Sequence, residues 1–242
     1  MSILNDPPLE RLLASLHGRS DEQIPAMNEY YARQNVYAGA LPGEEADRIK
    51  TFRSDKLVAL DRDKAEFCYL LCRASQARRV VEAGTSYGVS TLYLAAAVRD
   101  NMRAAGGDNA HGDNIGTAGG DGVVIGTEYE PAKAAAARAH FEQTGLAPFI
   151  DLREGDLRLT LQRIDGPIDF VLLDIWTPMA RPALELVMPH LRQGAMVVCD
   201  NTKDHRAAYA DLFAFLDDPA NGFRTMTLPF GGGLELSVRC GA

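Results

Sequence analysis

Apolar residues along the chain fall into short continuous runs that alternate with stretches of helical spacing. Five runs contain mostly apolar residues, and they cover positions 79–83, 123–127, 150–153, 168–173 and 195–199. A helical pattern follows each run. Continuous apolar strands separated by helices are typical of a parallel sheet that is covered on both faces. The pattern therefore predicts a doubly wound, Rossmann-like α/β fold.

The end of the chain departs from this alternation. Positions 223–228 and 234–239 both read as strands, and only Pro229, Phe230 and three consecutive glycines separate them. No helix fits in so short a connection. We therefore predict a β-hairpin that closes one edge of the sheet.

The first part of the chain is predicted to be helical. Positions 9–16 and 24–33 have helical spacing, and positions 36–48 are predicted to form a connection. We predict an N-terminal helical unit over residues 1–56, which forms a cap or a dimer contact. A second unit over residues 57–242 contains the alternating strands and helices. Within the second unit, positions 61–78 predict a helix that packs its apolar stripe on the sheet. That stripe consists of Phe67, Leu70, Leu71 and Ala74.

One segment interrupts the pattern. Positions 101–122 are rich in Gly, Asp, Asn and Ala and contain almost nothing that would join a core. We interpret the segment as a flexible insertion on the surface. A solvated loop without a function is favoured over a lid above a substrate.

Composition narrows the class of protein. The 242 residues, 46% of them hydrophobic, are enough for one substantial core. A net charge of -8 argues against binding to a nucleic acid backbone. No stretch has the length of a membrane span, so we expect a soluble, cytoplasmic protein. Cys68 and Cys72 share a helix face without further zinc ligands nearby, and we interpret the four cysteines as reduced thiols.

The first chemical signal is a glycine-containing turn between a strand and a helix, from Glu82 to Ser90. Gly84 and Gly88 allow a tight turn and a close approach to a ligand. The following helix directs free N–H groups toward the same place. A nucleotide-like ligand fits such a turn, although many turns of this kind only connect two elements.

Acidic residues follow the next two strands. Glu128 ends the second strand, where its carboxylate would accept both hydroxyls of a ribose. Once the segment 101–122 is set aside, its spacing from Gly84 is close to the roughly 20 residues expected. After the third strand come Glu154, Gly155 and Asp156, which we place near an adenine.

A third set of polar residues follows the last two parallel strands. Asp174 ends the fourth strand, and Asp200 and Asn201 end the fifth. Three oxygen ligands at adjacent strand ends suit a hard cation, and Mg²⁺ is preferred over Mn²⁺ or Ca²⁺. Each residue alone would equally serve as a cap of a helix or turn.

The strings VVEAGTSYGVSTLYLA, GTEYEP, EGD, LLDIW and VVCDN together resemble the metal-dependent class I O-methyltransferases, which include catechol and caffeoyl-CoA O-methyltransferases. The resemblance implies a seven-stranded sheet of order 3-2-1-4-5-7-6 with an antiparallel last strand. It also implies S-adenosylmethionine as methyl donor, a small hydroxylated acceptor and a homodimer.

The same resemblance assigns roles to individual residues. Glu128 would hold the ribose of the donor, Asp156 would lie near its adenine, and Asp174 would serve both donor and metal. The methionine end of the donor would be surrounded by Glu82, Gly84, Ser86, Tyr87 and Ser90. We add to the donor-binding set the neighbouring residues Thr85, Tyr129, Gly155 and Trp176. Trp176 would alternatively wall the acceptor pocket or pack in the core.

The sequence departs from this family at one point. Catechol-type enzymes carry a lysine shortly after the metal aspartate, whereas this chain has Trp176, Thr177, Pro178 and Met179. Lys203 or His205 would replace that base, although residues in such a position are more often solvated loop residues.

Three alternatives stay open at this point. The turn also fits a G-x-S-x-G nucleophile elbow, with Ser86 as the nucleophile of a serine hydrolase. A nicotinamide oxidoreductase is disfavoured because the G-x-G-x-x-G pattern fails at Ser86. A donor-binding scaffold without turnover is motivated by the missing lysine.

Overall fold

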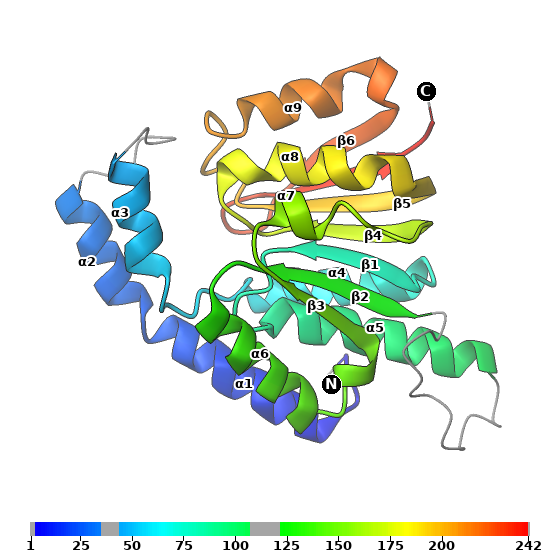
Figure 1. Ribbon diagram of the computed structural model, residues 1–242, viewed down its shortest axis with the longest axis horizontal. Coiled ribbons are helices and arrows are strands. Elements are labelled where there is room, and N and C mark those ends of the chain that lie inside the picture. Colours follow the sequence, from blue (N-terminus) through cyan, green and yellow to red (C-terminus); the bar gives the residue numbers. More distant parts are fainter. Residues whose placement is uncertain (1–2, 35–43, 107–121, 242) are drawn as a thin grey trace.

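The computed structural model describes residues 3–34, 44–106 and 122–241, which form helices around one twisted sheet (Figure 1). The helices are α1 (Pro7–Asp21), α2 (Ile24–Gln34), α3 (Glu44–Arg53), α4 (Arg62–Ala74), α5 (Val89–Gly106), α6 (Pro131–Gln143), α7 (Leu157–Thr160), α8 (Thr177–Val187) and α9 (Ala210–Asp217). The strands are β1 (Arg79–Ala83), β2 (Val123–Glu128), β3 (Ile150–Glu154), β4 (Ile168–Leu173), β5 (Leu191–Asp200), β6 (Phe223–Leu228) and β7 (Leu234–Arg239).

The sheet has the predicted order, β3-β2-β1-β4-β5-β7-β6. Strands β1 to β5 pair in parallel, whereas β7 runs antiparallel to both β5 and β6. The order reverses between β1 and β4, which lie side by side. In open sheets of this type, ligands bind at the carboxyl ends of the strands next to such a reversal.

Helices cover both faces of the sheet (Figure 1). One apolar cluster joins the sheet to α1, α4, α5 and α6, and a second joins it to α7, α8 and α9. The strands are buried from both sides, which explains their nearly continuous apolar sequence. Helices α2 and α3 lie beyond the carboxyl ends of the strands, on the left of Figure 1.

The buried face of α4 differs from the predicted one. Leu70, placed in the predicted stripe, is 50% exposed, whereas Lys64, Cys68 and Cys72 are buried at a spacing of four residues. Phe67 and Leu71 of the predicted stripe pack against the core, whereas Leu70 and Ala74 are exposed, so the prediction is wrong for these two residues. Burial of Lys64 is possible because its ammonium finds carboxylate partners, as described below. Cys68 and Cys72 are free thiols, as predicted.

Two segments predicted as loops are helical in part, 101–122 at its start and 36–48 at its end. Helix α5 continues to Gly106, so the predicted insertion is wrong over 101–106, and residues 107–121 lie outside the described part. The reason is Asn101, which is buried and donates to the carbonyls of Cys72 and Ala77 at 2.9 and 2.8 Å. Of the predicted connection 36–48, positions 44–48 are helical in α3, and residues 35–43 lie outside the described part.

Helix α1 is tied to the core through α5. The guanidinium of Arg99 bonds Asp6 at 2.6 Å, and His17 lies 3.3 Å from the hydroxyl of Tyr93. Leu9, together with other leucines of α1, belongs to the same apolar cluster as α5. The first helix is therefore held in a fixed place beside the sheet. The division of the chain at residue 56 stays a prediction.

Candidate functional site

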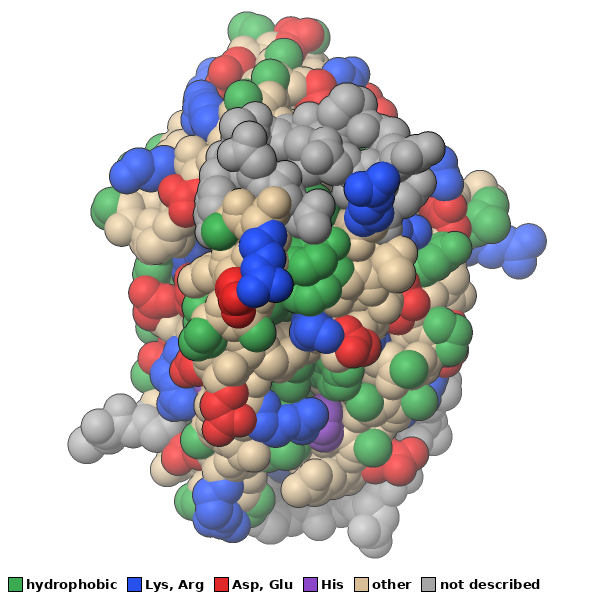
Figure 2. All heavy atoms as spheres, turned by 90° about the vertical axis from the view of Figure 1, so that its left-hand side faces the viewer, with side chains coloured by type: hydrophobic (Ala, Val, Ile, Leu, Met, Phe, Trp, Pro, Cys, Tyr) green, Lys and Arg blue, Asp and Glu red, His purple; other side chains and the backbone are tan. Residues whose placement is uncertain are grey.

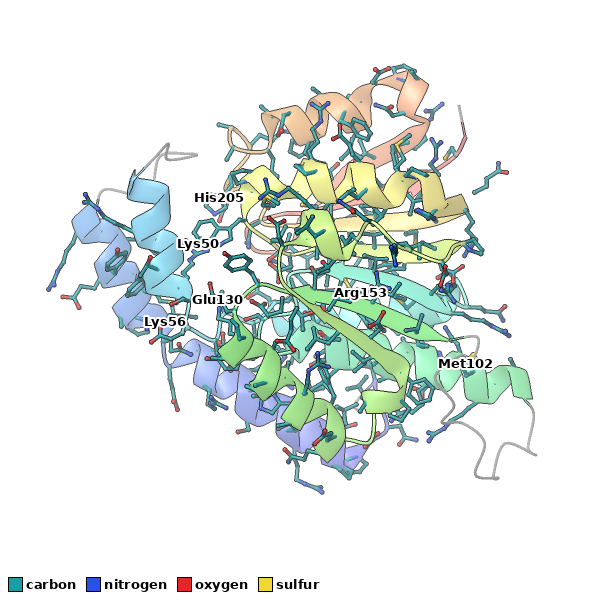
Figure 3. All side chains as sticks on the ribbon, in the orientation of Figure 1. Lys50, Lys56, Met102, Glu130, Arg153 and His205 are labelled. Atoms are coloured by element: carbon teal, nitrogen blue, oxygen red, sulfur yellow. The ribbon has the colours of Figure 1, made fainter. Side chains whose placement is uncertain are left out.

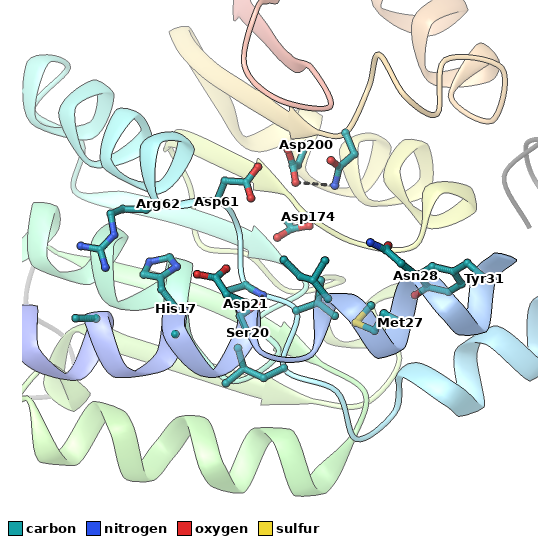
Figure 4. Close-up of a pocket in the computed structure, with 17 residues that line it drawn as sticks. His17, Ser20, Asp21, Met27, Asn28, Tyr31, Asp61, Arg62, Asp174 and Asp200 are labelled. Carbon is teal, nitrogen blue, oxygen red and sulfur yellow. Dashed lines mark hydrogen bonds between the residues drawn. The ribbon is translucent and has the colours of Figure 1, made fainter.

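Two cavities lie at the carboxyl ends of the parallel strands. The larger has a volume of about 540 Å³ and lies between α1, α2, the segment 57–62 and the tips of β4 and β5 (Figure 4). The smaller lies against the turn after β1, between that turn and the segment 57–60. Asp174 lines both cavities and is the charged residue common to their two walls. The cavities therefore adjoin at one carboxylate.

The turn after β1 is shaped by Gly84. This residue has a φ of +101°, and a Cβ placed on it would lie 2.0 Å from the backbone oxygen of Asp174. No side chain fits between the ends of β1 and β4 at this point. The backbone of Asp174 also donates to the carbonyl of Ala83 at 3.1 Å. The two strand ends are therefore in direct backbone contact.

Glu82 lies beneath the turn and is fully buried. Its carboxylate accepts hydrogen bonds from the hydroxyls of Thr85, at 3.0 Å, and of Thr91. Burial raises the pKa of Glu82, and hydrogen bonds from Ser90, Thr91 and Thr85 oppose that rise. Glu82 thus supports the turn from inside.

Glu128 connects the ends of three strands. Its carboxylate accepts from the backbone N–H of Ser86 at 2.7 Å and from that of Glu130 at 2.8 Å. Its carbonyl accepts from the N–H of Gly155, also at 2.8 Å. The predicted donor residues after β1, β2 and β3 are therefore brought together, with Glu128 in the middle.

The remaining predicted donor residues lie nearer the surface. Tyr87 donates its hydroxyl to the carbonyl of Asp55 at 3.0 Å. The ring of Tyr129 is exposed, and the Lys50 ammonium lies 4.2 Å from its centre. Asp156 caps α7 and bonds Arg158, whose hydrogen bonds hold the pKa of that carboxyl at about 2. These side chains form the rim of the site.

The predicted metal residues share one wall of the larger cavity. Asp174, Asp200 and Asn201 all line it, and Figure 4 shows the carboxylates of Asp174 and Asp200 directed toward the same space. The amide nitrogen of Asn201 donates to Asp200 Oδ2 at 2.8 Å. Burial raises the pKa of Asp174 well above its ordinary value, and the charges of Asp200 and Glu82 add to the effect. A cation brought by a ligand would reverse that rise.

Lys64 was not among the predicted site residues, yet its ammonium lies behind this wall. It donates to Asp200 Oδ1 at 2.7 Å and forms an ion pair with Asp61 at 2.9 Å. The side chain is 1% exposed. Burial alone would lower the pKa of Lys64, but the bonds to Asp200 and Asp61 raise it above its usual range. Its spacing from Cys68 and Cys72 was the sequence signal that the interpretation of α4 overlooked.

Eight predicted site residues are not part of either cavity wall, namely Glu82, Glu128, Tyr129, Gly155 and Asp156, described above, and Lys203, His205 and Trp176. The side chains of Lys203 and His205 are exposed, and neither is part of the cavity walls. His205 lies in the segment between β5 and α9, at the outer edge of the strand ends (Figure 3). Trp176 occupies the N-cap position of α8 without a side-chain hydrogen bond to the helix, and the Arg53 guanidinium lies 5.5 Å from its ring centre. No hydrogen bond between described residues joins the side chain of Lys203, His205 or Trp176 to Asp174.

The N-terminal helices supply residues that the sequence interpretation did not name. Asp21, Asn28 and Tyr31 line the larger cavity from α1 and α2, and Asp61 lines it from the start of α4 (Figure 4). His17 lines it as well, and burial lowers its pKa. The four carboxylates of the cavity wall therefore outnumber its basic side chains. No short motif marks these residues, because distant helices bring them together.

Figure 2 turns the edge that carries α2 and α3 toward the viewer. Lys and Arg side chains are interspersed there with Asp and Glu, with apolar surface between them. Among the described residues, no helix has both the length and the apolar character needed to cross a bilayer.

Known proteins show which family this arrangement belongs to. A family profile described as a methyltransferase domain matches residues 81–202, from β1 to the residues just after β5. The chain belongs to this methyltransferase family. The matched part of the methyltransferase contains the glycine turn, Glu128, Asp174 and Asp200. It does not contain α1 and α2, which line the larger cavity.

Individual relatives agree with this assignment. A catechol O-methyltransferase of Mycobacterium tuberculosis is 30% identical over 60% of this chain and 57% of its own length. The methyltransferase described here thus spans little more than half of that relative. A catechol O-methyltransferase of Niastella koreensis is 25% identical over 72% of this chain and 74% of its own.

A solved structure shows the same fold. The O-methyltransferase TomG of Streptomyces achromogenes, determined in complex with SAM, is 20% identical, with a TM-score of 0.63 over 88% of this chain and 96% of its own.

Proposed function

We propose that this chain is an S-adenosylmethionine-dependent O-methyltransferase that acts on a small hydroxylated acceptor. The observation that carries the proposal is the pair of adjoining cavities with Asp174 in both walls. Transfer between two molecules requires that their reacting atoms be held in contact and in line. The methyltransferase family, the names of the two relatives and the SAM complex of TomG support the choice of donor.

The surface along the ends of β1, β2 and β3 is proposed to hold the donor, and the smaller cavity, of about 10 Å³, is the part of it that adjoins the acceptor cavity. Glu128 would accept the ribose hydroxyls, because it already lies between the ends of β1 and β3. The adenine would lie at Gly155 and Asp156. The methionine end would lie along the glycine turn, at Glu82, Gly84, Thr85, Ser86, Tyr87 and Ser90. Tyr129 and Trp176 would complete the rim.

The larger cavity is proposed to hold the acceptor. A volume of about 540 Å³ suits a small molecule. The carboxylates of Asp21, Asp61, Asp174 and Asp200 face it, opposed by Arg62. An acceptor with its own carboxylate would be repelled, so we propose that the acceptor is neutral or cationic. Catechol is therefore a better first probe than a catechol that carries an acid group.

The residues of the chain then orient the reaction. When bound, the donor supplies an electrophilic methyl group on a positively charged sulfur. Asp174 would lie beside both reactants and accept the hydroxyl proton as the bond between the acceptor oxygen and the methyl group forms and the bond between the methyl group and the donor sulfur breaks. The carboxylate would also stabilise the positive charge nearby, which favours its ionised form. Alignment of this kind is worth an effective molarity of about 10⁵ M or more.

The divalent metal predicted at Asp174, Asp200 and Asn201 stays a proposal, supported by the position of these three side chains on one wall of the larger cavity. Asp200 accepts hydrogen bonds from the Lys64 ammonium and the Asn201 amide, as ligating carboxylates commonly do. A metal held by these residues would lower the pKa of the acceptor hydroxyl and fix its oxygen. A homodimer and a cytoplasmic location stay predictions.

Calorimetry with S-adenosylmethionine tests the donor, and mass spectrometry of incubations with catechol tests the transfer. We expect donor binding and a product heavier by one methyl group. Donor binding without transfer to any neutral diol would favour the scaffold. Absence of donor binding would remove the proposal.

The hydrolase alternative has its own test. Cleavage of an activated ester that disappears in Ser86→Ala would favour it. Among the described residues, no histidine side chain bonds Ser86, and the His140 ring contacts the Tyr87 carbonyl instead.

A further inference from the structure

A short segment without regular structure is common to the two cavities. Residues 57–60 lie between α3 and α4 and form neither helix nor strand. Leu57, Val58 and Ala59 line both cavities, and the side chains of Leu57 and Leu60 are buried. We call residues 57–60 the shared wall. A donor and an acceptor bound in their proposed places would both pack against it.

The backbone of the shared wall is bonded by side chains of the N-terminal helices. A buried segment needs such partners, because no helix or strand neighbour supplies them. Gln23 lies in the turn between α1 and α2, and its amide nitrogen donates to the Leu57 carbonyl at 3.2 Å. Its amide oxygen accepts from the Leu57 N–H, also at 3.2 Å. Ser20 Oγ accepts from the Ala59 N–H at 3.0 Å. The shared wall is therefore anchored to the end of α1.

The orientation of the Gln23 amide is determined by a third contact. Its nitrogen also donates to the carbonyl of Arg19, in the last turn of α1, at 2.8 Å. An exchanged nitrogen and oxygen would place the amide oxygen against two carbonyl oxygens, which is unfavourable. Gln23 is half-buried and lines neither cavity. It therefore reaches the site only through Leu57.

The chain just before the shared wall is held from the opposite side. The Lys133 ammonium, from α6, donates to the carbonyl of Arg53 at 2.9 Å. The Tyr87 hydroxyl, from the glycine turn, donates to the carbonyl of Asp55 at 3.0 Å. The connection between α3 and α4 thus joins the end of α1 to the ends of the strands. Gln23 helps to set how far apart these two parts lie.

We propose that Gln23 is a positioning residue for methyl transfer, because it fixes the shared wall against which both reactants pack. The inference rests on the proposed function. Transfer in line from sulfur to oxygen requires one distance and one angle, and a misplacement of about 1 Å lowers a rate by as much as about 100-fold. Without the Gln23 bonds the shared wall would shift, while the side chains that line each cavity would stay in place. The kcat should therefore fall more than either affinity.

Kinetics with S-adenosylmethionine and catechol test this split. The variants are Gln23→Ala and Gln23→Met, of which the second keeps a long side chain without hydrogen bonds. We expect the kcat of both to fall about tenfold. The KM for catechol and the Kd for the donor in calorimetry should stay within about twofold. Gln143→Ala, at an exposed glutamine of α6, is the matched control and should change none of the three.

Amide hydrogen exchange, followed by nuclear magnetic resonance, tests the anchoring without any turnover. The Leu57 N–H should exchange at least about tenfold faster in Gln23→Ala than in wild type. Amides of β1 and β4 should keep their wild-type rates, because they do not depend on Gln23. Absent binding of S-adenosylmethionine by wild type would instead contradict the proposed function, and the exchange of Leu57 would still decide whether Gln23 fixes the shared wall.

Several results would overturn the inference. An unchanged kcat in both folded variants would show that the position of the shared wall does not limit transfer. A KM that rises as much as the kcat falls would assign Gln23 to acceptor binding. Unchanged exchange of Leu57 would show that other contacts hold the shared wall. Loss of the folded state in both variants, seen by circular dichroism, would assign Gln23 to stability alone.

Discussion

The two halves of the site are built by different means. In the half proposed to bind the donor, called the donor half, backbone N–H groups at the ends of β1, β2 and β3 converge on Glu128, and Gly84 brings two strand ends into contact. In the half proposed to bind the acceptor, called the acceptor half, side chains from α1, α2 and the start of α4 surround a cavity of about 540 Å³. The family profile covers the first half and leaves α1 and α2 outside. We therefore propose that donor recognition is a property of the sheet and that acceptor recognition is a property of the helices around it.

The charges of the two halves are also managed differently. Glu128 accepts hydrogen bonds from neutral backbone amide groups. Asp200 accepts one from the Lys64 ammonium, which lies out of reach of solvent. The full positive charge of Lys64 therefore offsets the charge of Asp200, whereas the neutral amides leave that of Glu128 uncompensated.

Gly84→Ala should have the largest effect, because this residue joins the two halves. The new Cβ would collide with the backbone oxygen of Asp174, at a φ that disfavours any side chain. We expect a loss of about 4 kcal/mol in the free energy of unfolding, measured with urea, and loss of donor binding. Gly145→Ala is the matched control, since its φ is +67° and its Cβ would meet nothing within 4 Å. That variant should lose about 1 kcal/mol. Equal losses would remove the special role of the β1–β4 contact.

Glu128→Ala should damage the donor half alone. Removal of a carboxylate that accepts two backbone hydrogen bonds and the proposed ribose should weaken donor binding about 100-fold in calorimetry. The Michaelis constant for catechol should stay within about twofold. Glu142→Ala, an exposed glutamate of α6, is the control and should change neither constant. A rise in the catechol constant as large as that for the donor would contradict the separation of the halves.

Tyr31→Ala should damage the acceptor half alone. The ring lines the larger cavity, and its hydroxyl accepts a hydrogen bond from Arg53. We expect the Michaelis constant for catechol to rise about tenfold, with donor affinity unchanged. Tyr31→Phe keeps the ring and should remain near wild type, which separates the wall of the cavity from the hydrogen bond. Weaker donor binding in the alanine variant would show that α2 belongs to both halves.

His17 provides the smallest effect, on stability. Burial and the nearby Arg62 lower its pKa from 6.5, so the folded protein binds its proton less readily than the unfolded chain does. Its contribution is complete above about pH 6.5 and is lost as the pH falls through the lower pKa of the folded state. Urea unfolding at about pH 7.5 and about pH 5.5 should therefore show a larger loss in wild type than in His17→Gln. Parallel losses in the two proteins would show that His17 does not limit the acid stability of the acceptor half.

The sheet could be predicted because each strand is buried on both faces and thus carries its own apolar signature. The position of the residues proposed to bind the donor could be predicted for a related reason, since they directly follow strands whose ends meet at one edge. Asp174, Asp200 and Asn201 were brought together on one wall in the same way.

What could not be predicted depends on contacts between distant elements. Lys64 interrupts the buried face of α4, and only its pairing with Asp200, 136 positions away, makes that burial possible. Asn101 continues α5 into a segment of loop-like composition because it bonds carbonyls at the end of α4. Lys203 was chosen as a base from its proximity to Asn201 in sequence, yet its backbone N–H bonds Gly232 and its side chain is exposed.

The backbone contact between Gly84 and Asp174 has a consequence for how new acceptors would be accommodated. Because main-chain atoms touch here, no side chain separates the glycine turn, where we propose that the methyl group departs, from the Asp174 backbone. Molecules of different length must therefore present their hydroxyl at one invariant depth and differ only at their opposite end. Redesign toward a bulkier alcohol should begin at α1 and α2, where the chain can change without shifting that depth.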